Sequence, residues 1–418
     1  MAGNTTRGED VAITGIAICL SKEAKNEKLM HFPTIIRAYF LVLQYKISIC
    51  SLVNKISMKK LIITIVVIAS SSGSVAHGEE QNQDSAFSIS GYAETYYSYD
   101  FNNPNKSKKL PFIYSYNKNN EVSVNLAFLK GSYNSDSARA NLAIAGGSYM
   151  SANYASEPGV LNNIYESNIG LKLSKNNNLW FDAGVFSSHL GFESAIGKDN
   201  WTLTRSIGAD SAPYFETGAK VSYTSENDVW FVSALVLNGW QRIRRVEENS
   251  SPSFGTQITY KPSAKVTLNS STFIGNDKPD SVKKMRYFHN FYGIFQLNNK
   301  LSAVFGFDIG AEQKSKGSSS YNSWINPTII FKYMPTAKTA IAIRAEYYED
   351  KNGVIIPTDT SNGFKTWGFS TNFDYSIANN IVWRAEIKRL NSKDNIFTRN
   401  NHMVNSNVSM TTALAVNF

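Results

Sequence analysis

Serine and histidine are the first candidates for chemistry in this chain, because a serine beside a histidine can act as a nucleophile. His289 alternates in phase with Tyr287 and Phe291, and the nearest hydroxyl groups on that face belong to Ser270 and Thr272. The chain contains no Gly-x-Ser-x-Gly motif. A histidine within an aromatic band is more often an interfacial residue, so we expect no enzyme. A phospholipase-type hydrolase is the less favoured alternative.

Metal and cofactor chemistry has little support in the sequence. Both cysteines, Cys19 and Cys50, precede the patterned part of the chain, and the histidines that follow them are far apart. Acidic residues such as Asp277, Asp280 and Asp350 lack the spacing of a calcium-binding loop. No glycine-rich phosphate loop is present. We therefore expect no metal, no cofactor and no catalytic residue.

The segment from residue 188 to 212 mixes charged and aromatic residues in a way that suits the constriction of a channel. Its candidates for that role are Glu193, Asp199, Trp201 and Arg205. Charges and rings at a narrow point can select solutes by electric field and by width. The alternative is that Trp201, Arg205 and Phe192 have no role in a channel and only pack this loop against the neighbouring strands.

Charged residues that alternate with apolar ones imply a wall with one hydrated face and one apolar face. Ile381, Trp383, Ala385 and Ile387, for example, alternate with Arg384, Glu386 and Lys388. The residues that we expect to face a water-filled lumen are Glu216, Lys220, Arg286, Asp308, Arg344, Glu346, Asp374, Arg384, Glu386 and Lys388, with Glu166, Lys172 and Lys332 as further members. Their mixed signs favour a weakly selective pore.

Alternation of this kind recurs from about Phe87 to Phe418 in segments of about ten residues, which is the pattern of a transmembrane β-barrel. We expect an all-β fold, a single antiparallel barrel of about 16 strands, with a range of 14 to 18. A soluble β-sandwich or propeller is the alternative.

Short turns and long polar loops alternate strictly along the chain. The expected long loops are 102–120, 150–163, 188–212, 241–252, 276–284, 314–321, 350–362 and 391–405. Short turns are typical of the periplasmic side of bacterial barrels, and long loops of the outside. An even strand number would then place both termini in the periplasm of a Gram-negative cell.

The N-terminal region contains an export signal. Met58, Lys59 and Lys60 precede a short apolar run that ends in small residues at Ala76, which is the pattern of a cleavable signal peptide over residues 58–76. We expect residues 77–86 to form a short periplasmic tail and residues 87–418 to form the barrel. Residues 1–57 do not fit this scheme; we expect translation to begin at Met58, so that residues 1–57 are a mis-annotated, disordered or loosely helical extension. The alternative is an apolar membrane helix over 32–53.

Charge and the C-terminus indicate the partners. Residues 1–76 hold nine of the 42 Lys and Arg and four of the 33 Asp and Glu, which leaves only +4 for the rest. This is too little for a nucleic-acid-binding face. A last strand that ends in Phe418 resembles the signal recognised by the barrel assembly machinery of the outer membrane. Cations in the outer loops, such as Arg242, Arg244 and Arg245, suit three roles equally: attracting anions to the channel mouth, pairing with the phosphates of lipopolysaccharide, or pairing with Glu247 and Glu248.

Several motifs resemble those of one family. They are Gly191-Phe192-Glu193, Asp199-Asn200-Trp201 with Arg205-Ser206, Pro213-Tyr214-Phe215-Glu216-Thr217-Gly218, Asn238-Gly239-Trp240, and Gly91-Tyr92 with Tyr96-Tyr97. The chain resembles the OmpL-like β-barrel porins, the family called β-barrel porin-2. The resemblance implies an integral outer-membrane porin for passive diffusion of small hydrophilic solutes and carries no catalytic residues; by analogy with other porins a homotrimer is expected. A closed or substrate-specific barrel, including a surface-binding scaffold, is the alternative.

Overall fold

The computed structural model describes residues 86–104 and 109–418. The expectations for residues 1–57, for the signal peptide and for nearly all of the short tail therefore fall outside the described residues. Among the described residues, no helix combines the length and the apolar character that a membrane-spanning helix needs.

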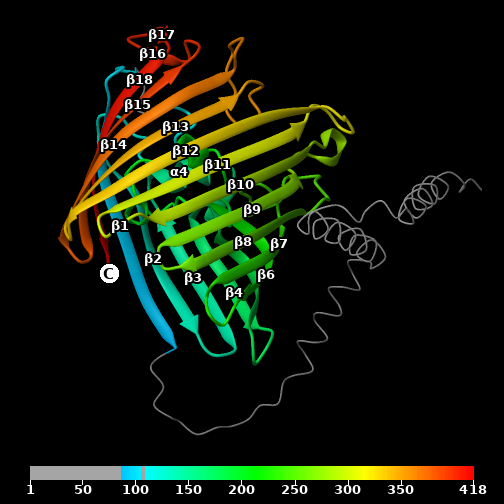
Figure 1. Cartoon of the computed structure of the whole chain (residues 1–418). Helices are drawn as coiled ribbons and strands as arrows, with labels where there is room; N and C mark the ends of the chain where they lie inside the picture. Colours follow the sequence, from blue (N-terminus) through cyan, green and yellow to red (C-terminus); the bar gives the residue numbers. More distant parts are fainter. Residues whose placement is uncertain (1–85, 105–108) are drawn as a thin grey trace, which may run out of the picture. The chain divides into compact units, whose positions relative to one another are not determined.

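Sixteen antiparallel strands form a closed barrel in which each strand pairs with its neighbours in the sequence (Figure 1). The strands are β1 (Phe87–Asp100), β2 (Val122–Asn134), β3 (Ala138–Gly146), β4 (Ile164–Lys172), β5 (Asn178–Ser187), β6 (Phe215–Thr224), β7 (Trp230–Leu237), β8 (Ser253–Ser263), β9 (Val266–Asn276), β10 (Met285–Gln296), β11 (Leu301–Gln313), β12 (Tyr321–Thr336), β13 (Thr339–Asp350), β14 (Phe364–Ala378), β15 (Ile381–Ser392) and β18 (Ser406–Asn417). The predicted fold class and strand number are confirmed.

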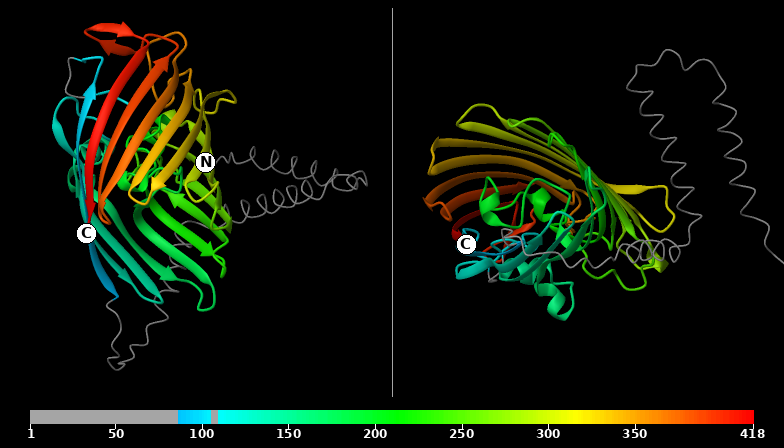
Figure 2. Two further views of the ribbon diagram at one scale, coloured as in Figure 1. Left: turned by 60° about the vertical axis from the view of Figure 1, so that its left-hand side comes forward. Right: turned by 90° about the horizontal axis from the view of Figure 1, so that it is seen from below.

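The barrel closes between its first and last strands, which lie side by side in Figure 2 as blue β1 and red β18. Closure leaves no unpaired strand edge in the ring. At the end of the seam, Gly91 N donates to Phe418 O at 2.7 Å and Phe418 N donates to Gly91 O at 3.0 Å. The Phe418 ring lies so close to Gly91 that a Cβ there would overlap it. The terminal aromatic residue and this glycine thus form one contact.

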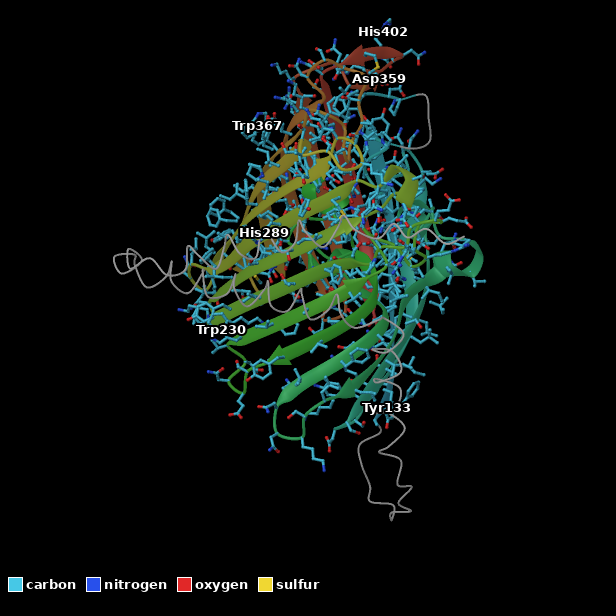
Figure 3. The ribbon with its side chains drawn as sticks, turned by 90° about the vertical axis from the view of Figure 1, so that its right-hand side faces the viewer. Tyr133, Trp230, His289, Asp359, Trp367 and His402 are labelled. Carbon is cyan, nitrogen blue, oxygen red and sulfur yellow. The ribbon has the colours of Figure 1, made fainter. Side chains whose placement is uncertain are left out.

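The outer face of the wall is apolar. Along β15, Trp383 and Ile387 are exposed, whereas Arg384, Glu386 and Lys388 on the opposite face are buried. In Figure 3, Trp367, His289 and Trp230 follow one another down the outer wall, with Asp359 and His402 at the upper end and Tyr133 at the lower end. This is the arrangement of a surface that faces lipid between two aromatic bands.

The long loops contain short helices and one unexpected hairpin. The helices are α4 (Ser148–Asn153), η2 (Gly159–Asn163), η3 (Gly197–Asp199), α5 (Ile207–Asp210) and η4 (Asp280–Val282). The last of the expected long loops, 391–405, contains the hairpin of β16 (Phe397–Arg399) and β17 (His402–Val404). Its two central residues, Asn400 and Asn401, both have positive φ, 47° and 69°, as a tight hairpin turn of the favoured hand requires.

The inner face is not polar throughout. Near the long-loop ends of their strands, Phe273, Phe288, Trp324 and Phe364 form an apolar cluster, and Ile356 from the loop after β13 packs against it. The strands thus place large apolar side chains on both faces at this level. The wall therefore has one apolar and one polar face in its part away from the long loops, whereas both faces carry apolar side chains near the long loops.

Candidate functional site: the inner loop and its docking wall

The segment between β5 and β6, Ser188–Tyr214, is called the inner loop here because it lies within the ring of strands (Figure 2, right, green). His189 anchors its first turn to the wall: Nδ1 lies 2.7 Å from Glu216 Oε2 and Nε2 lies 2.8 Å from the carbonyl oxygen of Thr272. Burial acts to lower the pKa of His189, but the Glu216 carboxylate and the Thr272 carbonyl outweigh it and raise the pKa above its usual range.

Polar side chains hold the inner loop in shape from within. Asn200 Nδ2 donates to Ser194 O at 2.9 Å and Ile196 O at 2.8 Å, while Ser194 N donates to Asn200 Oδ1 at 2.7 Å. Arg205 donates to the carbonyl oxygens of Ser194, Leu203 and Ala195 at 2.7, 2.6 and 3.0 Å. Only 1% of Arg205 is exposed, so its guanidinium group satisfies loop carbonyls that have no strand partner.

Glu193 completes this internal frame. Its carboxylate accepts hydrogen bonds from the backbone N–H and the hydroxyl of Ser206, the residue that caps α5 through Ala209 N. Burial is the largest influence on Glu193 and raises its pKa, although Arg344 at 3.6 Å opposes the rise. Glu193 therefore ties the first half of the loop to its second half and to the wall.

Arg344 of β13 is the centre of the docking contact between the loop and the wall. Its Nη1 donates to Thr202 Oγ1 at 2.9 Å and Thr204 O at 2.7 Å, and its Nη2 donates to Thr204 Oγ1 and Glu386 Oε1, both at 3.0 Å. Glu386 in turn accepts from Thr204 N at 2.5 Å and from Thr204 Oγ1 at 2.8 Å. Arg344 of β13 and Glu386 of β15 thus share one buried hydrogen-bond network with Thr202 and Thr204 of the loop.

The docking contact continues along the next residues of the loop. Glu346 Oε2 accepts from Ile207 N at 2.5 Å, and Lys388 Nζ donates to Arg205 O at 3.0 Å. Lys388 Nζ also lies 3.0 Å from Glu346 Oε1. These contacts hold the start of α5 against β13 and β15.

Arg384 binds the earlier part of the loop. Its Nη1 and Nη2 donate to Gly197 O at 2.5 Å and Asn200 O at 2.9 Å, and its guanidinium pairs with Asp374 at 2.7 and 2.9 Å. With Arg384, the wall contributes three cations and three carboxylates to the docking contact, namely Arg344, Arg384 and Lys388 with Glu346, Asp374 and Glu386. A buried set of charges that balances in this way avoids an unpaired charge in low dielectric.

The four predicted constriction residues have different surroundings. Glu193 and Arg205 form hydrogen bonds with other residues of the inner loop. Asp199 is exposed, and burial of part of its surface raises its pKa despite Lys198 nearby. Trp201 packs against the apolar residues of β11 to β13, with Lys332 Nζ 5.8 Å from its ring centre. Of these four residues, only Asp199 is exposed to solvent.

The predicted lumen residues fall into two groups. Arg344, Glu346, Asp374, Arg384, Glu386 and Lys388 take part in the docking contact just described. Glu216 binds His189, Lys220 Nζ lies 4.8 Å above the ring of Phe186, Arg286 pairs with Glu312 at 2.6 Å, and Asp308 accepts from Asn290 at 2.5 Å.

Sequence reasoning missed the neutral residues that do much of the docking. Thr202 and Thr204 take three of the four hydrogen bonds of Arg344, and Asn372 Oδ1 accepts from Leu203 N at 3.0 Å. Threonine and asparagine are common in polar loops, so their type and spacing carried no signal. For Asn372 the sequence does carry one indication, since it alternates with Phe369, Phe373 and Tyr375 in the same phase as the predicted lumen residue Asp374.

Asp210, near the end of the inner loop, has a pKa that is shifted by burial. Burial raises the pKa of Asp210 to about 7, although Lys388 and the hydroxyl of Tyr214, at 2.9 Å, favour its charged form. The charge of Asp210 therefore depends on pH in the neutral range.

Two cavities lie on opposite sides of the inner loop. One of about 360 Å³ is lined by Asp210, Trp240, Arg242, Arg286 and Ile355, on the long-loop side. Another of about 170 Å³ is lined by Lys198, Lys332, Lys338, Asp374 and Arg384, on the short-turn side. The loop with its docking wall separates the two spaces.

The outer wall does bring the serine and histidine of the hydrolase alternative together. Ser270 Oγ lies 2.8 Å from His289 Nε2, and the His289 ring packs against Phe291 with 3.8 Å between ring centres and a tilt of 35°. Within residues 86–104 and 109–418, however, no side chain orients the other ring nitrogen of His289. The described part of the chain also contains no group of three or more His, Cys, Asp and Glu residues able to hold a metal ion.

Three solved structures of similar fold are described as a porin, an outer-membrane protein and an outer membrane channel. The anion-selective porin from Comamonas acidovorans matches with a TM-score of 0.53 at 8% identity, over 79% of this chain and 99% of that chain. The outer-membrane expressed OmpT of Vibrio cholerae matches with a TM-score of 0.53 at 9% identity, over 81% and 100%. The outer membrane channel DcaP of Acinetobacter baumannii matches with a TM-score of 0.52 at 12% identity, over 79% and 97%.

A search of curated proteins finds no match. The family described as "Putative beta-barrel porin-2, OmpL-like" matches residues 86–418, which is the whole barrel. The motifs around the inner loop, the closed ring of sixteen strands and this match agree. The chain therefore belongs to the OmpL-like family of outer-membrane β-barrel porins.

Proposed function

We propose that this outer-membrane porin lets small hydrophilic solutes diffuse passively and that the inner loop sets the width of its channel. The observation that carries the proposal is the docking of the loop, through Thr202, Thr204 and Ile207, onto Arg344 and Glu386 and their neighbours deep inside the ring. A loop held by so many hydrogen bonds keeps a defined position, and a defined position is what a size limit requires.

Solutes would pass the loop on its open side, where Asp199 and the residues of the short-turn cavity are accessible. Because the wall network balances its charges, the field at the narrowest point would be weak. Lys198, Lys332 and Lys338 around the short-turn cavity favour anions there. We expect a weakly selective pore with a mild preference for anions.

Single-channel recording in planar bilayers tests the proposal directly. The full barrel should conduct, and deletion of residues 200–205 should increase the conductance by removing the part of the loop that crosses the lumen. A purified, folded barrel without conductance would contradict the open pore. An unchanged conductance after the deletion would make the loop a packing element only.

A second candidate is a closed or substrate-specific barrel, and the apolar cluster near the long loops favours it. The lumen is narrowed from the wall by four aromatic side chains and from a loop by Ile356, which packs against them. The four are Phe273, Phe288, Trp324 and Phe364. Deletion of residues 353–357 would distinguish the two. Conductance that arises only after this deletion supports a closed barrel, whereas conductance of the intact chain supports the diffusion pore.

We place both chain ends of the barrel in the periplasm, because Gly91 and Phe418 meet on the side of the short turns. Asp359, at the opposite end in Figure 3, would then be extracellular. Asp359→Cys should react with a membrane-impermeant maleimide on intact cells. Labelling only after cell lysis would reverse the orientation.

Further partners follow from this placement. The last strand, ending at Phe418, would be read by the barrel assembly machinery, and lipopolysaccharide would surround the extracellular half. A homotrimer is supported by the similar fold of the trimer form of Vibrio cholerae OmpT, which matches with a TM-score of 0.50 at 8% identity over 79% of this chain and 99% of that chain. Native mass spectrometry of the purified protein would give the subunit number.

The N-terminal region completes the proposal. Residues 58–76 would direct export and be removed, residues 77–86 would form a short tail, and residues 1–57 would not be translated. N-terminal sequencing of the purified outer-membrane protein tests this. Any peptide from residues 1–57 in that material would contradict the start at Met58.

A further inference from the structure

The outer wall contains a hollow of about 550 Å³ over β12 to β15 and β18. The strand register explains its position. Across the wall, Ala345 lies beside Phe369, which lies beside Arg389 in one row, and Thr371 lies between Ile343 and Ile387 in the next row. Ala345 and Thr371 are small, whereas the apolar residues around them are large. The hollow is therefore a gap in the side-chain layer that faces the membrane.

The lining suits a hydrocarbon chain. Ile343, Phe369 and Ile387 are about half exposed on this face, and Phe331 and Ile329 close its other side. Such residues gain free energy when their exposed surface is covered by apolar groups. A lipid acyl chain is the apolar group that a membrane supplies at this place.

Arg389 lies at the edge of the hollow toward the long loops. Its Nε donates to Asn391 Oδ1 at 3.0 Å, and no carboxylate of residues 86–104 or 109–418 forms an ion pair with it. One row closer to the loops than Arg389 is Trp367, high on the outer wall in Figure 3. By contrast, Lys365 on the same face is neutralised by Glu349 at 2.6 Å.

A cation without an anionic partner on a lipid-facing surface costs free energy that depends on its depth in the bilayer. A phosphate group at the membrane boundary would remove this cost, because a guanidinium group binds phosphate with two parallel hydrogen bonds. The level of the Trp367 band is where lipid head groups begin. Arg389 and the hollow below it thus match the two halves of one lipid molecule, a phosphate above and an acyl chain beneath.

We propose that this site binds the phosphorylated glycolipid of the outer leaflet, lipopolysaccharide, with a lipid A phosphate on Arg389 and an acyl chain in the hollow over Ala345 and Thr371. The choice of this lipid rests on the proposed orientation, in which the long loops face outward and Arg389 lies in the outer leaflet. A phosphate-bearing lipid of the inner leaflet would not reach it.

Delipidated full-length barrel, incubated with purified lipid A and examined by native mass spectrometry, provides the test. Arg389→Gln removes the cation, and Ala345→Phe fills the hollow. Each should weaken lipid A binding about tenfold or more, the size of a lost charge-assisted contact. The matched controls are Lys265→Gln, an exposed cation of a short turn, and Ala234→Phe, an outward alanine on β7. Both should bind lipid A within about twofold of the parental chain.

The lipid probes separate the two halves of the site. Lipid A without phosphates should bind the parental chain as weakly as intact lipid A binds Arg389→Gln. Equal binding of intact lipid A to all variants, or preference for phosphatidylglycerol over lipid A, would overturn the proposal. Conductance of the same preparations shows whether the porin function stands, so a failure of the lipid site and a failure of the pore can be told apart.

Discussion

Arg344→Leu is the change that tests the inner loop most directly. The substitution removes four hydrogen bonds of 2.7 to 3.0 Å, three of them to Thr202 and Thr204 of the loop. It also leaves Glu386, which is 2% exposed, with only the neutral donors of Thr204.

The cost of breaking a buried ion pair by removing one partner is about 3–5 kcal/mol. The strand ladders do not depend on this side chain, so most of the cost falls on the docked position of the loop. A loss of this size changes the equilibrium between docked and released loop by roughly 10²- to 10³-fold or more. We therefore expect a loop that leaves its docking wall for a substantial part of the time.

Single-channel recording would show the release as a larger mean conductance with frequent transitions between levels. Arg139→Leu is the control, because it breaks a wall ion pair with Asp182, at 2.7 and 2.6 Å, that is more exposed than the Arg344 network and does not touch the inner loop. The control should keep the parental conductance. If Arg344→Leu folds and conducts as the parental chain does, the loop does not limit the channel and the reasoning from its docking is wrong.

Three further predictions concern other parts of the barrel. The folded-state pKa of Asp210, raised by burial to about 7, exceeds its unfolded value of about 3.9, so its contribution to stability is complete below about pH 4 and is lost as the pH rises through 7. In urea unfolding, the free energy of unfolding should decline less between pH 5 and pH 8 for Asp210→Asn than for the parental chain; equal declines would contradict this. Phe418→Ala removes the ring that covers Gly91 and should lower the yield of assembled barrel in the outer membrane, measured by heat-dependent gel mobility, whereas Phe418→Tyr should not. Ser270→Ala and His289→Ala should leave phospholipid release at the background level of the parental chain, since no side chain of residues 86–104 or 109–418 orients the second ring nitrogen of His289; release that either substitution abolishes would establish a hydrolase.

The strands and their two faces were predictable because neighbouring side chains on a strand point in opposite directions whatever the rest of the fold does. The run from Arg384 to Lys388 shows this: three charged residues separated by apolar ones lie on the inner face, as their alternation indicated. The segments that form the sixteen strands follow from the same local rule, and the alternation of turns and loops follows from the turn-forming and polar residues between them. They need no knowledge of which strands become neighbours beyond their order in the chain.

The partners of these residues were decided by the tertiary structure alone. Arg205 and Glu193 carried the charges expected of a constriction, yet they bind backbone and hydroxyl groups of their own loop, because a loop that crosses the lumen must satisfy its own carbonyl and N–H groups. Arg344 binds Thr204, which is 140 residues away in the chain, and no local pattern links the two residues. The hollow beside Arg389 also depends on the tertiary structure, because a gap between side chains forms only where small and large residues of five strands are neighbours. The register that makes them neighbours cannot be read from the sequence of any single strand.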